Sequence, residues 1–349
     1  MQTFFIVAIL GLGFLITFQI AKASEYVAVL RGEEKARKQT NKINAFMLLV
    51  FLIVGLIGVY YCNEKLQGKI LGEPASDHGV LIDRMLYITL ALTGIVFVIT
   101  QVALFWFSFK YQESDKRKAY YYPHNNKLEL IWTVIPAIAL TILVGFGLFY
   151  WFNITGKAPD NAMVVEVTGS QFKWEFRYPG DDKVLGKKYF KNIDEAKSNS
   201  LGQLWDDPYN RDDIYNAGEV HLVKNVPVKF VINAKDVIHD VGLPHFRMKM
   251  DAVPGTPTTM WFTPKYTTKE MAEKTGKPNF VYELSCDQMC GKGHYSMRAV
   301  VVVETQAEFD AWMATKKPQY LVANPDKDPN AAKPAVTDTT GNKVTAAIK

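Results

Sequence analysis

The chain has 349 residues, of which 48% are hydrophobic and 21% are charged. This composition excludes a disordered or fibrous protein, and the length suffices for a soluble domain together with a membrane part. The net charge of +5 does not indicate nucleic-acid binding, because no basic face with interleaved aromatic residues is present. With only three cysteines, the chain has no disulfide framework to hold its fold.

Four long segments contain no Asp, Glu, Lys or Arg: 1–21, 43–63, 85–109 and 130–156. A helix needs ~20 apolar residues to cross ~30 Å of hydrocarbon. We therefore predict that residues 1–156 form an anchor in the lipid bilayer with four transmembrane helices, at about 1–21, 43–63, 85–109 and 130–152.

The connecting segments predict the orientation of this anchor. Residues 22–42 carry six Lys or Arg, residues 64–84 carry three and residues 110–129 carry five. Because basic connections stay in the cytoplasm, we expect a multi-pass protein of the inner membrane with everything after about residue 157 on the outer, periplasmic side. A cleaved signal peptide is the alternative for 1–21, but no positive segment precedes the apolar run.

Residues 157–317 change to short β-type runs with Gly and Pro between them, which predicts an all-β sandwich. The runs are 163–168, 172–178, 220–223, 228–233, 258–262, 280–285 and 297–304. A polar insertion at 181–216 interrupts them. One helix is expected from Thr305, with Glu308 completing a capping box, to about Lys316, followed by a flexible polar tail over 318–349.

Four soft or borderline metal ligands lie within twelve residues: Cys286, Cys290, His294 and Met297. Thiolate, imidazole and thioether together favour copper, whereas zinc sites have little use for the thioether. His239 follows a β-type run 47 residues before Cys286, and a sandwich can bring such a strand end beside a later loop. The sequence therefore predicts a copper site.

The alternative for the two cysteines alone is a disulfide, since the outer compartment is oxidising. A mononuclear blue-copper site uses one thiolate, whereas this loop offers Cys286 and Cys290. Two bridging thiolates imply two copper ions. No Cys-x-x-Cys-His occurs in the sequence, so we expect no covalent haem on this chain and a separate electron donor.

The loop resembles the binuclear copper loop of cytochrome c oxidase subunit II, and the segments Asp236-Val-Ile-His239 and Lys249-Met-Asp-Ala-Val-Pro-Gly255 are similar to the same family. The resemblance covers roughly residues 85–315 and implies a cupredoxin-like sandwich. It also implies these metal ligands: Cys286 and Cys290 as bridges, His239 and His294 as terminal ligands, Met297 as a weak axial ligand and the Gln288 carbonyl as the other.

Three departures from the family pattern stand out. The family often has Glu at the position of Gln288, where the side chain reaches a magnesium ion. Its electron-accepting residue is usually Trp where this chain has Phe172, so Phe172 or Trp174 is expected at the donor-docking surface, against the alternative that both rings belong to the sandwich core. The extra N-terminal helices and the insertion resemble the oxidases that associate with alternative complex III.

Glu129 opens the fourth predicted membrane helix at the cytoplasmic side. The resemblance implies that it lines the mouth of a proton pathway into subunit I. The alternative is an interfacial carboxylate that is stabilised by the helix dipole.

Taken together, these patterns predict subunit II of a terminal haem-copper oxidase. It would accept single electrons from a c-type cytochrome and pass them to the haem of subunit I, with oxygen chemistry in that partner and other oxidase subunits around it. Two other classes remain open. One is a membrane-anchored copper chaperone, and the other is a structural subunit of a quinol oxidase, which would keep the anchor and sandwich without the ligands.

Overall fold

The computed structural model describes residues 2–66 and 72–329, which divide into two compact units. One unit runs to Gly72 and includes Met85–Gly145. The other comprises Glu73–Arg84 and the chain from Phe146 onward.

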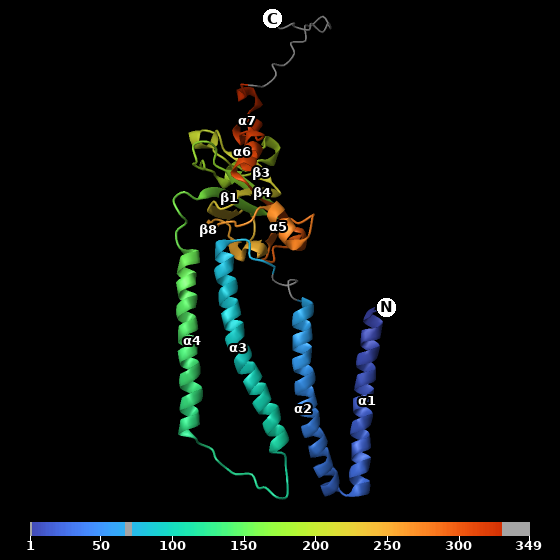
Figure 1. Cartoon of the computed structure of the whole chain (residues 1–349). Helices are drawn as coiled ribbons and strands as arrows, with labels where there is room; N and C mark the ends of the chain where they lie inside the picture. Colours follow the sequence, from blue (N-terminus) through green and yellow to red (C-terminus); the bar gives the residue numbers. More distant parts are fainter. Residues whose placement is uncertain (1, 67–71, 330–349) are drawn as a thin grey trace, which may run out of the picture. The chain divides into compact units, whose positions relative to one another are not determined.

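Four long helices precede the strands, as Figure 1 shows. They are α1 (Gln2–Arg31), α2 (Glu33–Leu66), α3 (Asp77–Lys110) and α4 (Asn126–Thr155). Among the described residues, α2, α3 and α4 are long and apolar enough to cross a membrane.

Within the described residues the structure thus supports three membrane-spanning helices, one fewer than the predicted four. The predicted span at 1–21 lies within α1, and its side chains up to residue 10 fall outside the described part of the chain.

The second unit contains two five-stranded sheets. The first has the order β3 (Ile214–Ala217), β2 (Lys173–Tyr178), β1 (Met163–Ser170), β5 (Val228–Ala234) and β8 (Thr258–Phe262). The second has the order β4 (Glu219–Val223), β10 (Arg298–Glu304), β9 (Tyr282–Cys286), β6 (His239–Leu243) and β7 (Met248–Ala252). The predicted class, a membrane-helical anchor followed by a cupredoxin-like β-sandwich, is confirmed.

All seven predicted strands are present, and three strands were not predicted: β3, β6 and β7. Most neighbours pair antiparallel, but β1 with β5 and β4 with β10 are parallel. The parallel pairs require the chain to cross over rather than turn back directly. These crossovers bring residues that are far apart in sequence to the same end of the sandwich.

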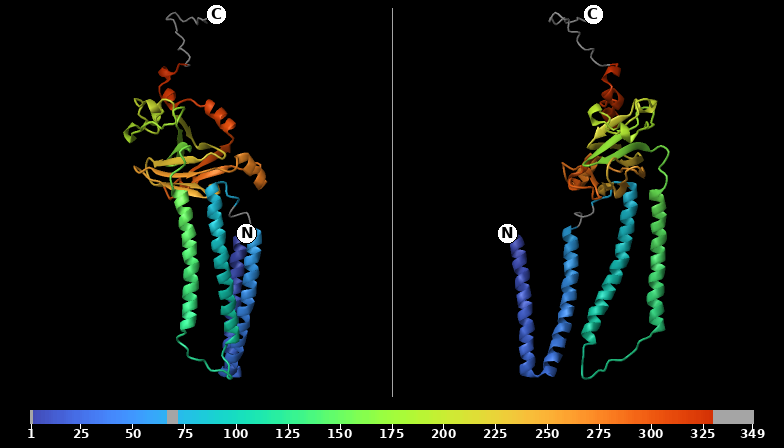
Figure 2. Two further views of the ribbon diagram at one scale, coloured as in Figure 1. Left: turned by 60° about the vertical axis from the view of Figure 1, so that its left-hand side comes forward. Right: turned by 180° about the vertical axis from the view of Figure 1, so that it is seen from behind.

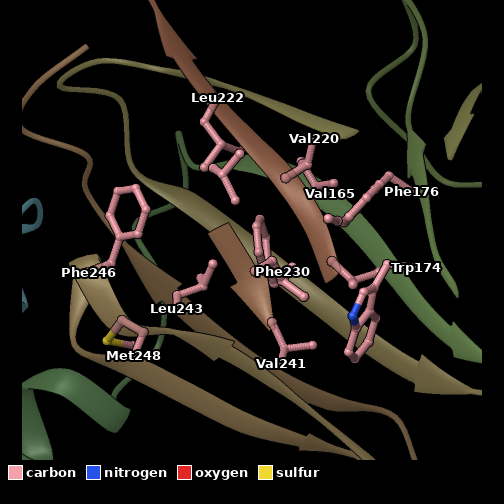
Figure 3. Packing of buried hydrophobic residues seen from close by; sticks show 14 of the residues in the cluster. Val165, Trp174, Phe176, Val220, Leu222, Phe230, Val241, Leu243, Phe246 and Met248 are labelled. Carbon is pink, nitrogen blue, oxygen red and sulfur yellow. The ribbon is translucent and has the colours of Figure 1, made fainter. Parts of the chain in front are cut away.

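The core lies between the two sheets (Figure 3), where side chains from both point toward one another. Phe230, Trp174 and Val165 come from the first sheet, and Leu222 and Val241 come from the second; all five are fully buried. Burial of one such large side chain contributes roughly 1.5–3 kcal/mol. Buried and partly buried positions alternate along β10 after the exposed Arg298, with the period of two that a strand has.

The insertion at 181–216 is held by a buried ion-pair cluster rather than lying loose on the surface. Arg177 of β2 donates through Nε to Glu166 (2.7 Å) and through Nη1 to Asp213 (2.8 Å), Asn210 (3.0 Å) and the Gly186 carbonyl (2.9 Å). Three short 3₁₀ helices lie in the insertion: η1 (Phe190–Asn192), η2 (Glu195–Lys197) and η3 (Pro208–Asn210). Its last residues form the start of β3.

The remaining elements are helical. They are η4 (Pro244–Phe246), α5 (Thr268–Thr275), η5 (His294–Ser296), α6 (Gln306–Ala314), α7 (Gln319–Ala323) and η6 (Pro325–Lys327). The predicted capping box is confirmed: Thr305 caps α6 and accepts from the backbone N–H of Glu308, whose side chain accepts from the Thr305 N–H.

The predicted tail over 318–349 begins with α7, which Figure 2 shows in red beside the yellow-green insertion. Gln319 donates to the Ser198 carbonyl of the insertion (2.5 Å). From residue 330 on, the predicted tail lies outside the described residues.

Candidate metal centre

Two strands and one loop position the predicted metal ligands. His239 is the first residue of β6, and Cys286 is the last residue of β9. These strands pair with Val241 opposite Cys286, so the histidine and the cysteine lie at the same end of the sheet. The loop from Asp287 to Met297 then returns to β10, and the Cys286 N–H donates to the Met297 carbonyl (3.1 Å), which closes the loop.

The donor atoms converge around the two sulfur atoms. Cys286 Sγ lies 3.7 Å from Cys290 Sγ, and each sulfur has one imidazole Nδ1 beside it, that of His239 at 3.8 Å from Cys286 and that of His294 at 3.7 Å from Cys290. Met297 Sδ lies 3.8 Å from Cys290 Sγ. The Gln288 carbonyl lies 3.2 Å from Cys286 Sγ. All six predicted ligands are thus brought together.

The sulfur–sulfur distance distinguishes this arrangement from a disulfide, in which the two atoms are about 2.05 Å apart. Both cysteines are free thiols in the structure. Burial and the neighbouring Cys286 raise the pKa of Cys290 to about 11, burial being the larger cause. Without a cation the thiol therefore keeps its proton, and a bound metal ion would supply the positive charge that a thiolate needs here.

The predicted ligands differ in how deeply they are buried. His239 and Met297 are fully buried, and Cys286 and Cys290 are nearly so, whereas His294 is half-buried. Among the described residues, His239, Cys286 and Cys290 are the one group of His, Cys and carboxylate side chains with ligand atoms within 4.8 Å of each other. A buried set of sulfur ligands suits copper, and imidazole is a ligand that copper also accepts.

Phe172 lies in the two-residue turn between β1 and β2, beside this loop. Its side chain is 38% exposed. A Cβ atom built on Gly293 would approach the Phe172 ring to 2.5 Å, and one on Gly291 would approach it to 3.3 Å, so the ring rests directly on the loop glycines. This position matches the prediction of an aromatic residue at the surface next to the site.

Trp174 does not lie at the surface, so of the two predicted rings it is Phe172 that has an exposed position next to the site. The Trp174 side chain is fully buried, and its ring contacts the His239 ring edge-to-face at 5.9 Å between centroids. The physical reason is the strand register: Gly169 pairs with Trp174 and Ser170 with Lys173, which turns Trp174 into the sandwich. Trp174 therefore supports His239 from inside the core.

Glu129 lies in the first turn of α4 and accepts a hydrogen bond from the Asn125 N–H (3.2 Å), while the Asn125 side chain accepts from the Leu128 N–H (3.0 Å). Both side chains satisfy free N–H groups at the start of the helix. The hydrogen bond from Asn125 supports the alternative, in which Glu129 stabilises the start of the helix. The role of Glu129 in a proton pathway stays a proposal.

Two residues beside the ligands received no role from the sequence. Asp236 Oδ1 lies 2.8 Å from His239 Nε2, and Gln171 Nε2 donates to the Cys290 carbonyl (2.6 Å). The contact between Asp236 and His239 could have been predicted from their spacing, since they are only three residues apart. No local pattern links Gln171 to Cys290, which is 119 residues away.

Two family models match the chain: the transmembrane domain of cytochrome c oxidase subunit II over residues 74–149 and its periplasmic domain over residues 163–305. An alternative cytochrome c oxidase subunit 2 from Bradyrhizobium diazoefficiens is 34% identical over 271 residues, which cover 77% of this chain and 92% of the relative. A probable cytochrome c oxidase subunit 2 from Rickettsia bellii is 28% identical over 279 residues, covering 78% of this chain and 94% of the relative.

Among solved structures, the periplasmic domain of cytochrome oxidase subunit II from Bradyrhizobium japonicum is 21% identical with a TM-score of 0.32. The match covers 48% of this chain and 99% of that domain.

Proposed function

Because the chain belongs to the cytochrome c oxidase subunit II family, we infer that its role is electron transfer within a haem-copper oxidase. We propose that it accepts single electrons from a c-type cytochrome at a binuclear copper centre and passes them to the haem of subunit I. Reduction of oxygen would then take place in subunit I and not on this chain.

The observation that carries this proposal is the donor set around the two sulfurs. Two thiols lie 3.7 Å apart at the centre, with one imidazole on the outer side of each. A thioether and a backbone carbonyl complete the set. These residues fit a pair of copper ions, since the two sulfurs can be shared and each ion then has its own histidine. When bound, such a pair would supply a one-electron redox centre.

The chain's own residues would keep that centre rigid. Four ligands are buried, and the loop ends on two strands that pair with each other through Arg298 and Ser285. Because little space is available for the ligands to move, little rearrangement would accompany a change of charge.

We infer the orientation from α3 and α4 alone. Residues 110–129, which comprise their connection and the helix ends beside it, carry five Lys and Arg, and this favours the cytoplasmic side. The β-sandwich would then lie on the periplasmic side of the inner membrane, where a c-type cytochrome can reach it. We further propose that the donor belongs to an alternative complex III supercomplex. The usual anchor of the family has two helices, and α2 in the anchor and the insertion in the β-sandwich are the additions that resemble the oxidases of that type.

The test is the copper content of the purified full-length chain, measured together with its visible and electron-spin-resonance spectra. Two coppers per chain in a mixed-valence state, with the unpaired electron shared by both ions, are expected. One copper with a mononuclear blue spectrum would contradict the binuclear centre. Copper that exchanges freely with a chelator would favour a chaperone instead, and a chain that binds none would favour a structural subunit.

A further inference from the structure

Two residues that are not ligands, Asp236 and Gln171, form hydrogen bonds to the segments that carry the predicted ligands; we call this pair the brace. Asp236 lies in the segment between β5 and β6. Asp236 Oδ1 lies 2.8 Å from His239 Nε2, while the opposite ring nitrogen, Nδ1, faces Cys286 Sγ. Because His239 is fully buried, water does not reach the ring, and the carboxylate is the acceptor that Nε2–H needs. This contact leaves the Nδ1 lone pair directed at the sulfurs.

The second member of the brace is Gln171, in the turn between β1 and β2. Its backbone N–H donates to the other oxygen of Asp236, Oδ2 (2.7 Å). Its side-chain Nε2 donates to the Cys290 carbonyl (2.6 Å) and would lie 2.8 Å from a Cβ on Gly291, so the amide packs closely against the loop. Two hydrogen bonds therefore connect the histidine segment to the cysteine loop through one turn.

Packing fixes the same elements from the other side. A Cβ on Gly169 would meet the His239 ring at 3.0 Å, and the Trp174 ring contacts the His239 ring edge-to-face, so the imidazole is packed closely against both residues. Lys235, next to Asp236, donates its backbone N–H to the Gly169 carbonyl (3.0 Å) and forms a buried ion pair with Glu175. The segment that carries Asp236 is thus anchored independently of the metal ligands.

We propose that Asp236 and Gln171 are positioning residues of the metal centre. Asp236 sets the tautomer and ring orientation of His239 and increases the electron donation of its Nδ1, and Gln171 holds the Cys290 backbone at a fixed distance from that histidine. Carboxylates that accept from a ligating histidine have this effect in metal sites generally. The proposal rests on copper being the metal of the proposed function.

The experiment compares Asp236→Ala, Asp236→Asn and Gln171→Ala in the full-length chain. The readouts are copper per chain, resistance of the copper to a chelator, and the reduction potential. Loss of the carboxylate is expected to weaken copper retention by roughly 10- to 100-fold and to raise the potential, because a less basic histidine stabilises the oxidised state less. Asp236→Asn keeps an acceptor without the charge and should fall between wild type and Asp236→Ala.

Asp160→Ala is the matched control, because it removes the same charge from an exposed position, where the carboxylate forms an ion pair with nearby Lys157. Wild-type retention and potential in both Asp236 variants would overturn the inference. A potential that moves equally in Asp160→Ala would also overturn it, since the effect would then be one of net charge.

Failure of the proposed function gives a different result, because the wild-type chain itself would then lack a copper pair. If Asp236→Ala does not fold, Asp236→Asn and Gln171→Ala still decide the matter. Unchanged potential and copper retention in these two variants would refute the positioning roles.

Discussion

The ring of Phe172 lies on Gly293, so close that a Cβ at this glycine would come within 2.5 Å of the ring atoms. Gly293 directly precedes His294, one of the predicted ligands. An aromatic side chain that is partly exposed on one side and in contact with the ligand loop on the other offers a short path from a docked donor to the site.

Phe172→Ala is therefore expected to slow the oxidation of the donor cytochrome while the copper content and spectrum stay unchanged. The ring contacts the loop but supplies no ligand atom. Stopped-flow measurement of donor oxidation on the same preparation as the copper assay tests this. Phe190→Ala is the control, because Phe190 is 71% exposed and lies in the insertion. Equal rates for Phe172→Ala and wild type would remove Phe172 from the path.

Trp174→Phe, unlike Phe172→Ala, should change the stability of the chain and not the rate of donor oxidation. The indole is fully buried, and its Nε1 has no hydrogen-bond partner within residues 2–66 and 72–329, so the substitution removes packing without breaking a polar contact. We expect lower thermal stability and normal donor oxidation. Complete truncation to Ala should cost ~3–5 kcal/mol and loosen copper binding through His239. Slower donor oxidation by a stable Trp174→Phe chain would return this residue to the electron path.

Phe172 is partly exposed and Trp174 is buried, and this difference could not be predicted from the sequence. The aromatic run predicts a strand, but its starting residue decides which rings face inward, and a shift of one residue exchanges the faces. β2 begins at Lys173 rather than Phe172, which leaves Phe172 in the turn. No local pattern specifies that boundary.

The ligand loop itself was predictable because its four side chains lie within twelve residues and the chemistry of the set is specific. His239 is harder to place. Its strand, β6, reads His-Asp-Val-Gly-Leu, with few residues that favour strands, yet all five positions are buried. The pairing with β9 makes it a strand, and that pairing is non-local. The same limit applies to the insertion, whose polar residues were expected on the surface but meet Arg177 in the interior.

Met297→Leu tests the axial role of the thioether. The two side chains have similar volumes, and Met297 is fully buried, so the fold should lose less than about 1.5 kcal/mol. Both coppers should be retained, and the reduction potential should rise because an apolar neighbour favours the less charged, reduced state. Cys290→Ser is the contrasting variant and should lose the binuclear centre. Loss of both ions from Met297→Leu would contradict an axial role.

The carboxyl group of Asp213, in the buried cluster that holds the insertion, should make the stability of the β-sandwich depend on pH. Burial raises the pKa of Asp213 to about 7, against the attraction of Arg177, from an ordinary value of 3.8. Between these two values the folded chain binds a proton that the unfolded chain has released. The free energy of unfolding should therefore decrease as the pH rises from about 4 to about 7, as far as this group is concerned.

Asp213→Asn isolates that contribution, because the amide mimics the neutral acid and can still accept from Arg177. Unfolding of the β-sandwich followed by tryptophan fluorescence should show a smaller decrease across this pH range in Asp213→Asn than in wild type. Asp181→Asn, an exposed position in the same insertion, should follow wild type. If the ion pair with Arg177 (2.8 Å) instead keeps Asp213 ionised, wild type will gain stability relative to Asp213→Asn as the pH rises, which is the opposite sign.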